Sequence, residues 1–265
     1  MNSRSWWQQL WSRWTAGANA DFIPQELWQL TLQRHPFLCD RSADELLRLR
    51  QMSAQFLQRK EFTGAHGLQI TDEMALSIAA QACLPVLGLG LHWYDDFQGI
   101  VVHPSAMLAA RQLQDEAGVV HQYQEELIGE AMPGGPVTLS WADVQEGSVE
   151  QGYNVVIHEF VHKLDMRDGV ADGCPPLPSR DLARRWTPVM RAAYDQFTEA
   201  LSLADRFGGP PPWLDPYAAT APAEFFAVAC EAYFVNRERF AVEWPELTAL
   251  FGEFFRIEGG GSATS

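Results

Sequence analysis

The residues with the clearest chemical potential are His158, Glu159 and His162, which form an H-E-x-x-H motif. On an α-helix, residues four apart lie on the same face, so both imidazoles can reach one ion. Glu159 lies about a quarter of a turn away, close enough to contact a water molecule on that ion without binding the ion itself. This spacing is typical of a helical zinc site.

The pattern around the motif favours an amphipathic helix within residues 152–169. Four apolar residues fall on the arc opposite the histidines and would bury that face: Ile157, Phe160, Val161 and Leu164. Ser148 and Gln151 match a capping box at the start, and Gly169 offers a stop. Such a helix would direct both histidines into a cleft.

The motif supplies two ligands, whereas catalytic zinc takes three protein ligands and keeps a fourth position open. A third histidine downstream is excluded, because no histidine follows His162. Asp165 lies three residues after His162 on the same helix face. Its short side chain is better placed to orient an imidazole than to bind the ion, but the spacing keeps it as a candidate ligand.

Glu224 is the other candidate for the third ligand. It lies at about the third position of a helix predicted to begin at Pro222, and Glu231 shares its helix face. A carboxylate in the first turn of a helix is also favoured by the helix dipole without any metal. Residue spacing therefore leaves Asp165 and Glu224 open as the third ligand, with Glu231 able to support the site from behind.

Composition and charge limit the classes of partner. The chain has 265 residues, of which 47% are hydrophobic and 12% aromatic, enough for a substantial core. Its 19 Lys and Arg against 34 Asp and Glu give a net charge of −15. Binding to nucleic acid or to an anionic membrane needs clustered positive charge, so direct nucleic-acid binding is excluded as the main function.

The cysteines and the apolar runs indicate in which cellular compartment the protein is expected. Four cysteines lie far apart without a C-x-x-C pair, which favours a reducing compartment: Cys39, Cys83, Cys174 and Cys230. The tryptophans of residues 1–20 are interrupted by polar residues, so no signal peptide is predicted. The longest apolar run, residues 82–91, is too short for a transmembrane segment. We expect a cytoplasmic protein.

The order of elements predicts an α+β fold that is mostly helical, with a small sheet beside the motif helix. Helices are expected at residues 25–33, 42–60, 71–83, 180–206, 222–236 and 245–257. Strands are expected at residues 66–70, 99–103, 119–127 and 136–141, the last two joined by a turn at 133–135. We divide the chain into a Trp-rich N-terminal arm (1–20), one domain (21–257) and a disordered tail (258–265).

Several blocks of sequence make the chain recognisable. They are CLPVLGLGLHW at residues 83–93, GPVTLSW at 135–141, the motif helix, and DPYAATAPAEFFAV at 215–228. With these blocks the chain resembles the Mlc titration factor A family of bacterial zinc metallopeptidases, which is itself similar to the catalytic domain of anthrax lethal factor. The resemblance covers roughly residues 25–255 and implies a single zincin-like metallopeptidase domain.

The resemblance also implies roles for individual residues. It makes His158, His162 and Glu224 the ligands of one Zn²⁺ ion, and Glu159 the general base. It makes Tyr217 a candidate hydroxyl donor to the oxyanion of the transition state. Asp165 and Glu231 then remain as residues that could orient the ligands.

Two functions follow from the resemblance. One is aminopeptidase-like hydrolysis of small peptides, together with binding of the glucose repressor Mlc, which would modulate expression of the glucose phosphotransferase system. The alternative is a regulatory protein that sequesters the repressor and has weak or vestigial peptidase activity. The intact Glu159 and Tyr217 favour retained chemistry, because a pure binding module needs neither.

The strand predicted at residues 136–141 has two interpretations. It could form the upper edge of the cleft and pair with an extended peptide substrate. It could equally be an ordinary interior strand.

Overall fold

The computed structural model describes residues 23–114, 120–127 and 129–256. Its α-helices are α2 (Gln25–Arg34), α3 (Ala43–Arg59), α4 (Asp72–Cys83), α5 (Trp141–Glu146), α6 (Val155–Asp165), α7 (Arg180–Phe207), α8 (Pro222–Val235), α9 (Arg237–Glu243) and α10 (Pro245–Phe255). Its short 3-10 helices are η2 (Pro36–Cys39), η3 (Leu91–Tyr94), η4 (Met166–Asp168) and η5 (Pro216–Ala219). The predicted N-terminal arm (1–20) and C-terminal tail (258–265) lie outside the described residues.

A four-stranded mixed sheet lies beside the motif helix α6, in the strand order β1–β2–β6–β5. The strands are β1 (Glu61–Gly64), β2 (Gly99–His103), β3 (Met107–Gln114), β4 (Val120–Leu127), β5 (Gly129–Ala131) and β6 (Val137–Ser140). β1, β2 and β6 run parallel, and β5 is antiparallel to β6. β6 is therefore an interior strand, and the edge strand on its side of the sheet is β5.

The first strand lies earlier than predicted. β1 precedes residues 66–70, where the sequence pattern predicted a strand, and that prediction was wrong. His66 and Gly67 have positive φ angles of 51° and 81°, a left-handed conformation that ends an extended strand. The last hydrogen bond of the pair runs from Ala65 N–H to the Val102 carbonyl, at 2.8 Å.

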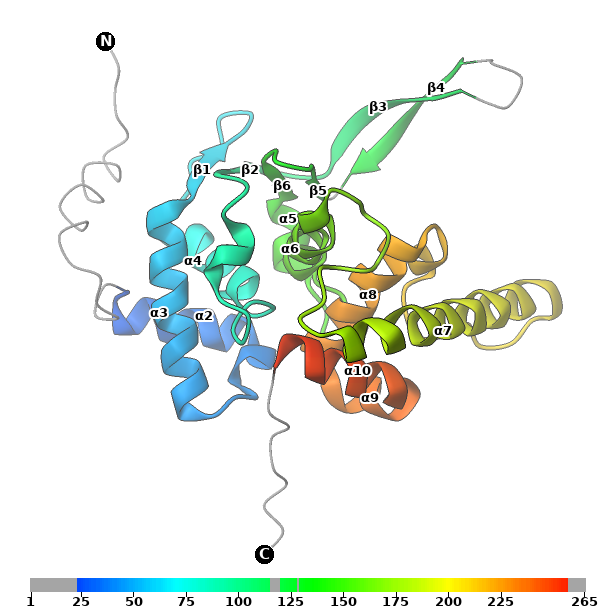
Figure 1. Ribbon diagram of the computed structural model, residues 1–265. Coiled ribbons are helices and arrows are strands. Elements are labelled where there is room, and N and C mark those ends of the chain that lie inside the picture. The colour runs from blue at the N-terminus through cyan, green and yellow to red at the C-terminus, as the bar shows by residue number, and fades with distance from the viewer. Residues whose placement is uncertain (1–22, 115–119, 128, 257–265) are drawn as a thin grey trace, which may run out of the picture.

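The strands between β2 and α5 are paired differently from the prediction. β4 and β6 match predicted strands, but β4 pairs with β3 in a separate antiparallel ribbon that extends away from the main sheet (Figure 1). The turn at residues 133–135 joins β5 to β6 rather than β4 to β6. β3 and β5 were not predicted; β5 spans only three residues, too few for a periodic pattern.

Helices α2, α3 and α4 pack on one side of α6 (Figure 1). α3 begins with a capping box, in which Ser42 Oγ accepts from Glu45 N–H and the Glu45 carboxylate accepts from Ser42 N–H. α4 contacts both α3 and α6, so all of its residues after the first two are buried. The apolar run that follows α4 stays in the core.

The start of α6 differs from the prediction. The capping box expected at Ser148 and Gln151 was wrong: Ser148 Oγ accepts from Gln151 N–H, but this closes a turn before the helix, where Ser148 also pairs with Tyr153. The residue that caps α6 is Asn154, whose Oδ1 accepts from Ile157 N–H at 2.9 Å. The Ser148–Gln151 pattern predicted the wrong helix start because a serine side chain makes the same hydrogen bond in a turn as at a helix cap.

The end of α6 agrees with the prediction. The helix passes into η4, and Gly169 then takes a left-handed conformation with φ 96°. Every residue of α6 except His158 is buried. The motif helix is thus a core element, and its one partly exposed position is His158 of the H-E-x-x-H motif.

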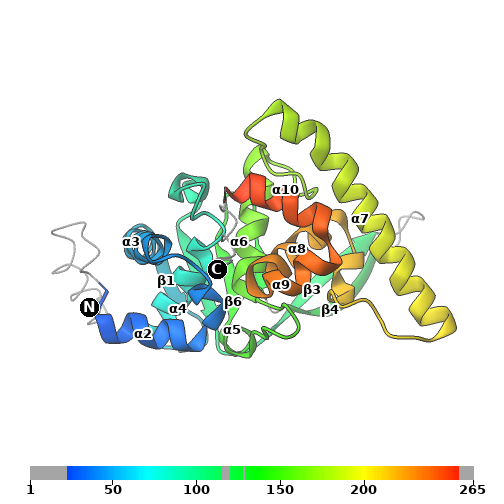
Figure 2. The same cartoon turned by 90° about the horizontal axis from the view of Figure 1, so that it is seen from below.

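The C-terminal helices pack on the other side of α6. α8 contacts α6 directly, and all of its residues except Pro222 and Glu224 are buried. Figure 2 shows α7 running along the outer side of α8 and α10 and extending beyond them at its C-terminal end. Aromatic rings of α7, α8 and α10 join these helices, with Trp186, Phe226 and Phe251 in mutual contact.

The predicted fold class, a mostly helical α+β fold with a small sheet, is confirmed. One hydrophobic cluster connects residues from α2 to α10. Within the residues that the structure describes, none of the helices combines the length and the apolar character needed to cross a membrane.

Candidate active site

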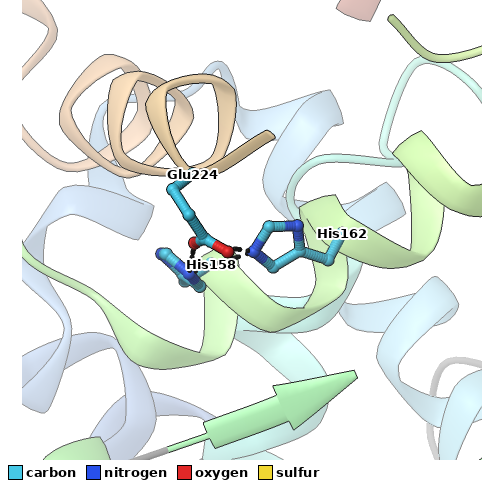
Figure 3. Close-up of side chains that lie close together, drawn as sticks. All are labelled: His158, His162 and Glu224. Atoms are coloured by element: carbon cyan, nitrogen blue, oxygen red, sulfur yellow. Dashed lines mark hydrogen bonds and ion pairs between the residues drawn. The ribbon is translucent and has the colours of Figure 1, made fainter. Parts of the chain in front are cut away.

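Three side chains from two helices converge on one point (Figure 3). His158 and His162 come from α6, and Glu224 comes from the first turn of α8. Glu224 Oε2 lies 3.1 Å from His158 Nε2 and 3.1 Å from His162 Nε2. The two Nε2 atoms are themselves 3.1 Å apart, so the three donor atoms form a nearly equilateral triangle.

These donor atoms fit a zinc ion. Ligands about 2.0–2.2 Å from zinc, at near-tetrahedral angles, are separated from one another by roughly 3.3 Å. The observed separations of 3.1 Å are close to that value. Two imidazoles and one carboxylate are also the donor set of open catalytic zinc sites, in which a fourth position is left for water or substrate.

Glu231 orients His158. Its Oε1 lies 2.7 Å from His158 Nδ1, and the glutamate side chain is only 2% exposed. A carboxylate can only accept a hydrogen bond, so Nδ1 carries the proton and Nε2 keeps its lone pair for a metal ion. In the absence of a metal ion, burial would lower the pKa of His158, but the charge of Glu231 and hydrogen bonding to Glu224 and Glu231 raise it well above its ordinary value.

Glu159 lies beside this cluster and is buried. Its burial, together with the nearby charges of Glu224 and Glu231, raises the pKa of Glu159 to about 8, against the lowering influence of His158. A divalent cation held by the three donor atoms would add positive charge nearby and favour the carboxylate form. Glu159 is thereby a group that can exchange a proton near neutral pH.

The edge strand β5 closes one side of Glu159. A Cβ atom at Gly129 would lie 2.4 Å from Glu159 Oε1 and 2.7 Å from its Cδ atom. Any other residue at this position would therefore displace the carboxylate. The backbone of the edge strand and the glutamate side chain are packed together because residue 129 has no side chain.

Tyr217 lies next to the cluster, on η5. Its ring centroid is 6.1 Å from that of His158, and its side chain is 47% exposed. Asp215 holds the start of this short helix, because its Oδ1 accepts from Tyr217 N–H at 2.8 Å. The phenol is thus at the border between the cluster and solvent.

Asp165 lies outside the group of three converging side chains. Its Oδ2 accepts from Gly173 N–H at 2.8 Å, so the carboxylate is directed to the loop after α6. Burial raises the pKa of Asp165 to about 6, although hydrogen bonding to Gly173 and the charge of His162 lower it. The structure brings together Glu224 and the motif histidines, and it places Asp165 at the packing of α6 against the following loop.

Sequence reasoning missed two residues that shape the site. Gly129 was hidden because its strand is short and the glycine has no chemical group of its own. Lys163, which follows His162, is fully buried and donates to the carbonyls of Met132 and Gly135, at 2.7 and 3.1 Å. A lysine inside an otherwise buried stretch of α6 was the available signal, because buried lysines are rare unless paired.

Comparisons with known proteins give the family of the chain. The family described as glucose-regulated metallo-peptidase M90 matches residues 7–256. Mlc titration factor A of Klebsiella pneumoniae subsp. pneumoniae is 37% identical over 222 residues, covering 83% of this chain and 82% of that protein. Mlc titration factor A of Salmonella arizonae is 36% identical over 239 residues, covering 90% of this chain and 92% of that protein. The chain therefore belongs to the glucose-regulated metallo-peptidase M90 family.

Proposed function

We propose that this protein is a zinc-dependent peptidase in which His158, His162 and Glu224 hold one Zn²⁺ ion. The observation that carries the proposal is the triangle of donor atoms 3.1 Å apart, with the buried Glu159 beside it. Zinc bound there would supply a Lewis acid, which polarises the scissile carbonyl and makes water more acidic.

The chain's own residues then have distinct tasks. Glu159 accepts a proton from the attacking water and returns it to the leaving amine, a role supported by its buried position next to His158. Glu231 keeps the proton of His158 on Nδ1, so that Nε2 faces the ion. Tyr217 is proposed to donate its hydroxyl proton to the developing oxyanion, a role supported by its place beside His158.

The proposed substrate is an extended small peptide. β5 is the edge strand beside Glu159, so an extended backbone can pair with it next to the proposed base. This assigns the edge position to residues 129–131 instead of the strand at 136–141 considered from the sequence, which is interior. An aminopeptidase-like preference is proposed from the family resemblance.

We also propose that the protein binds the repressor Mlc in the cytoplasm. Support comes from relatives at 36–37% identity that carry the name Mlc titration factor A. The four cysteines are all free, which suits a reducing compartment. A regulatory protein with weak or vestigial peptidase activity is the second candidate function, and it shares this binding role.

The peptidase proposal is tested with Glu159→Gln, which keeps the size of the side chain but removes the base. Metal content after dialysis and hydrolysis of a set of amino-acid anilides and short peptides are measured for both proteins. We expect one zinc per chain in each, and hydrolysis lower by about 100-fold or more in the variant. Equal hydrolysis by the two proteins would refute the assignment of Glu159.

The binding proposal is tested with purified Mlc by titration calorimetry. We expect wild-type protein and Glu159→Gln to bind Mlc equally, because the substitution leaves the surface unchanged. If the wild type does not bind Mlc, the binding proposal is refuted and only the peptidase proposal remains. Binding without hydrolysis of any peptide by the wild type would favour the second candidate function.

A further inference from the structure

A chain of buried polar groups leads from the proposed metal ligand His158 into α4. Glu231 Oε1 contacts His158 Nδ1, and its Oε2 accepts from Asn154 N–H at 2.5 Å. The side chain of Asn154 in turn donates from Nδ2 to Gln81 Oε1, at 2.6 Å. Gln81, Asn154 and Glu231 are 0%, 3% and 2% exposed, so water cannot replace these contacts.

The orientation of each amide in this chain is forced. Gln81 Nε2 lies 3.0 Å from the Ser77 carbonyl, which can only accept, so Gln81 must turn its Oε1 toward Asn154. Asn154 must then present Nδ2 to Gln81 and Oδ1 to Ile157 N–H, the bond that caps α6. One side chain in α4 thus determines how the first residue before the motif helix is held.

We propose that Gln81 is a positioning residue for the metal ligand His158, acting through Asn154 and Glu231. Holding the side chain of Asn154 fixes its backbone N–H, which is the donor that holds Glu231 Oε2. Glu231 then keeps a single position in which its Oε1 accepts the hydrogen bond donated by His158 Nδ1–H. The inference rests on the proposed function only in requiring that the three donor atoms bind a metal ion.

The role of Gln81 is separable from capping. Serine is as good a helix cap as asparagine, but it has no second donor to reach Gln81. Asn154→Ser therefore keeps the cap and removes the link to α4. Gln81→Met keeps the length of the side chain and removes the acceptor. Ser53→Ala is the matched control, because Ser53 is a buried polar residue of α3 whose hydroxyl donates to Leu49 O and not to Gln81, Asn154 or Glu231.

The experiment measures zinc affinity by competition with a chromophoric chelator, and the thermal midpoint of each metal-free protein. We expect Gln81→Met and Asn154→Ser each to weaken zinc binding by about tenfold, the lower end of the range for residues that orient ligands. The double variant should bind no more weakly than either single variant, because both substitutions break the same hydrogen bond. Ser53→Ala should stay within about twofold of the wild type.

Cobalt substitution adds a spectroscopic readout. The visible absorption of bound Co²⁺ reports the arrangement of its ligands, so we expect a changed spectrum in Gln81→Met and an unchanged one in Ser53→Ala. If Gln81 served packing alone, its substitution would alter the thermal midpoint of the metal-free protein. It would not alter the spectrum of a metal ion bound by the same three side chains.

The outcomes separate this inference from the proposed function. A wild-type protein that binds no zinc would remove the proposed function and this inference with it. If the wild type does bind zinc, three results would each overturn the inference and leave the proposed function intact. They are an unchanged zinc affinity in Gln81→Met, additive losses of affinity in the double variant, and an equal loss in Ser53→Ala. Should Gln81→Met fail to fold, Asn154→Ser decides, because its cap is intact: an unchanged affinity refutes the role of Gln81.

Discussion

At the scale of single residues, two of the three proposed metal ligands are partly exposed positions in helices that are otherwise almost wholly buried, and the third, His162, is buried. His158 is the one residue of α6 that is not buried, and Glu224 is one of two such residues in α8. The other residues of these helices are buried in the core, apart from Pro222, so the partial exposure of His158 and Glu224 indicates a role other than packing. Burial, reinforced by the carboxylates of Glu224 and Glu231 and opposed by His158, raises the pKa of Glu159 to about 8.

The third ligand can be tested by a matched pair of substitutions. Glu224→Gln and Asp165→Asn each replace a carboxylate by an amide of the same size. We expect zinc to be lost from Glu224→Gln on dialysis and kept by Asp165→Asn, because Asp165 is directed to Gly173 rather than to the donor triangle. Metal analysis of the dialysed proteins measures this, and loss of zinc from the Asp165 variant alone would reverse the assignment.

Gly129→Ala tests how the proposed general base, Glu159, is held. The new Cβ would overlap the Glu159 carboxylate, so we expect hydrolysis to fall by about 100-fold with zinc still bound, because a displacement of about 1 Å can cost this much. Gly252→Ala is the control: its Cβ would meet only Tyr233 Oη at 3.8 Å, within α10. Unchanged kcat in Gly129→Ala would show that the carboxylate does not depend on this glycine.

At the scale of elements, Lys163 fastens the β5–β6 turn to α6. Its ammonium group donates to Met132 O and Gly135 O and lies 3.7 Å from Asp96 Oδ2. The ring of Phe97 lies 4.5 Å from the same nitrogen atom, which adds a cation–π contact. The helix that carries the histidines therefore also holds the strand proposed to bind substrate.

Lys163→Met is expected to release this turn. It removes the two hydrogen bonds that this buried ammonium group donates to Met132 O and Gly135 O, and should lower the free energy of unfolding by about 3 kcal/mol. Because β5 is the proposed edge for substrate, KM for extended peptides should rise more than kcat falls. Denaturant unfolding and steady-state kinetics measure the two effects.

Lys60→Met is the matched control for Lys163→Met. Lys60 also donates to two carbonyls, but these belong to Tyr94 and Phe97 and not to the β5–β6 turn. We expect it to destabilise the fold comparably and to leave KM unchanged. Equal increases of KM in both variants would mean that stability, and not the position of β5, controls substrate binding.

At the scale of the whole molecule, α6 lies between two groups of helices that one hydrophobic cluster unites. The polar chain from His158 to Gln81 crosses this junction and continues to Ser77, whose hydroxyl lies 2.7 Å from His35 Nε2. Burial, and then the charge of Arg34, lower the pKa of His35 from 6.5 to about 4. The neutral imidazole is therefore part of the folded state.

Stability should consequently depend on pH through His35. Between pH 6.5 and about 4 the unfolded chain binds a proton that the folded chain does not, so the stabilisation present above pH 6.5 is lost as the pH falls. The slope from this group is at most about 1.4 kcal/mol per pH unit. His35→Gln should show a correspondingly flatter profile in denaturant unfolding between pH 4 and 7, and identical slopes would refute the role of His35.

Prediction from sequence worked where the signal was local. The periodicity of α3, α4, α7 and α8 placed these helices to within a few residues, because each buries one or more faces against the core. It failed where a few residues pair with distant ones: β3 and β5 were missed, and β1 was placed after the left-handed turn that ends it. Strand pairing is decided by the partner strand, which a short window cannot contain.

By itself, the sequence determined that His158, Glu159 and His162 share a helix, because the period of the α-helix alone puts residues four apart on one face. Residue spacing left Asp165 and Glu224 open as the third ligand, and only family resemblance favoured Glu224. The tertiary structure decided which carboxylate meets the histidines, since that depends on the packing of α8 against α6. The fit of Gly129 against Glu159, and the link from Gln81 to His158, are likewise contacts between segments far apart in the chain. Their geometry exists only once the core has formed.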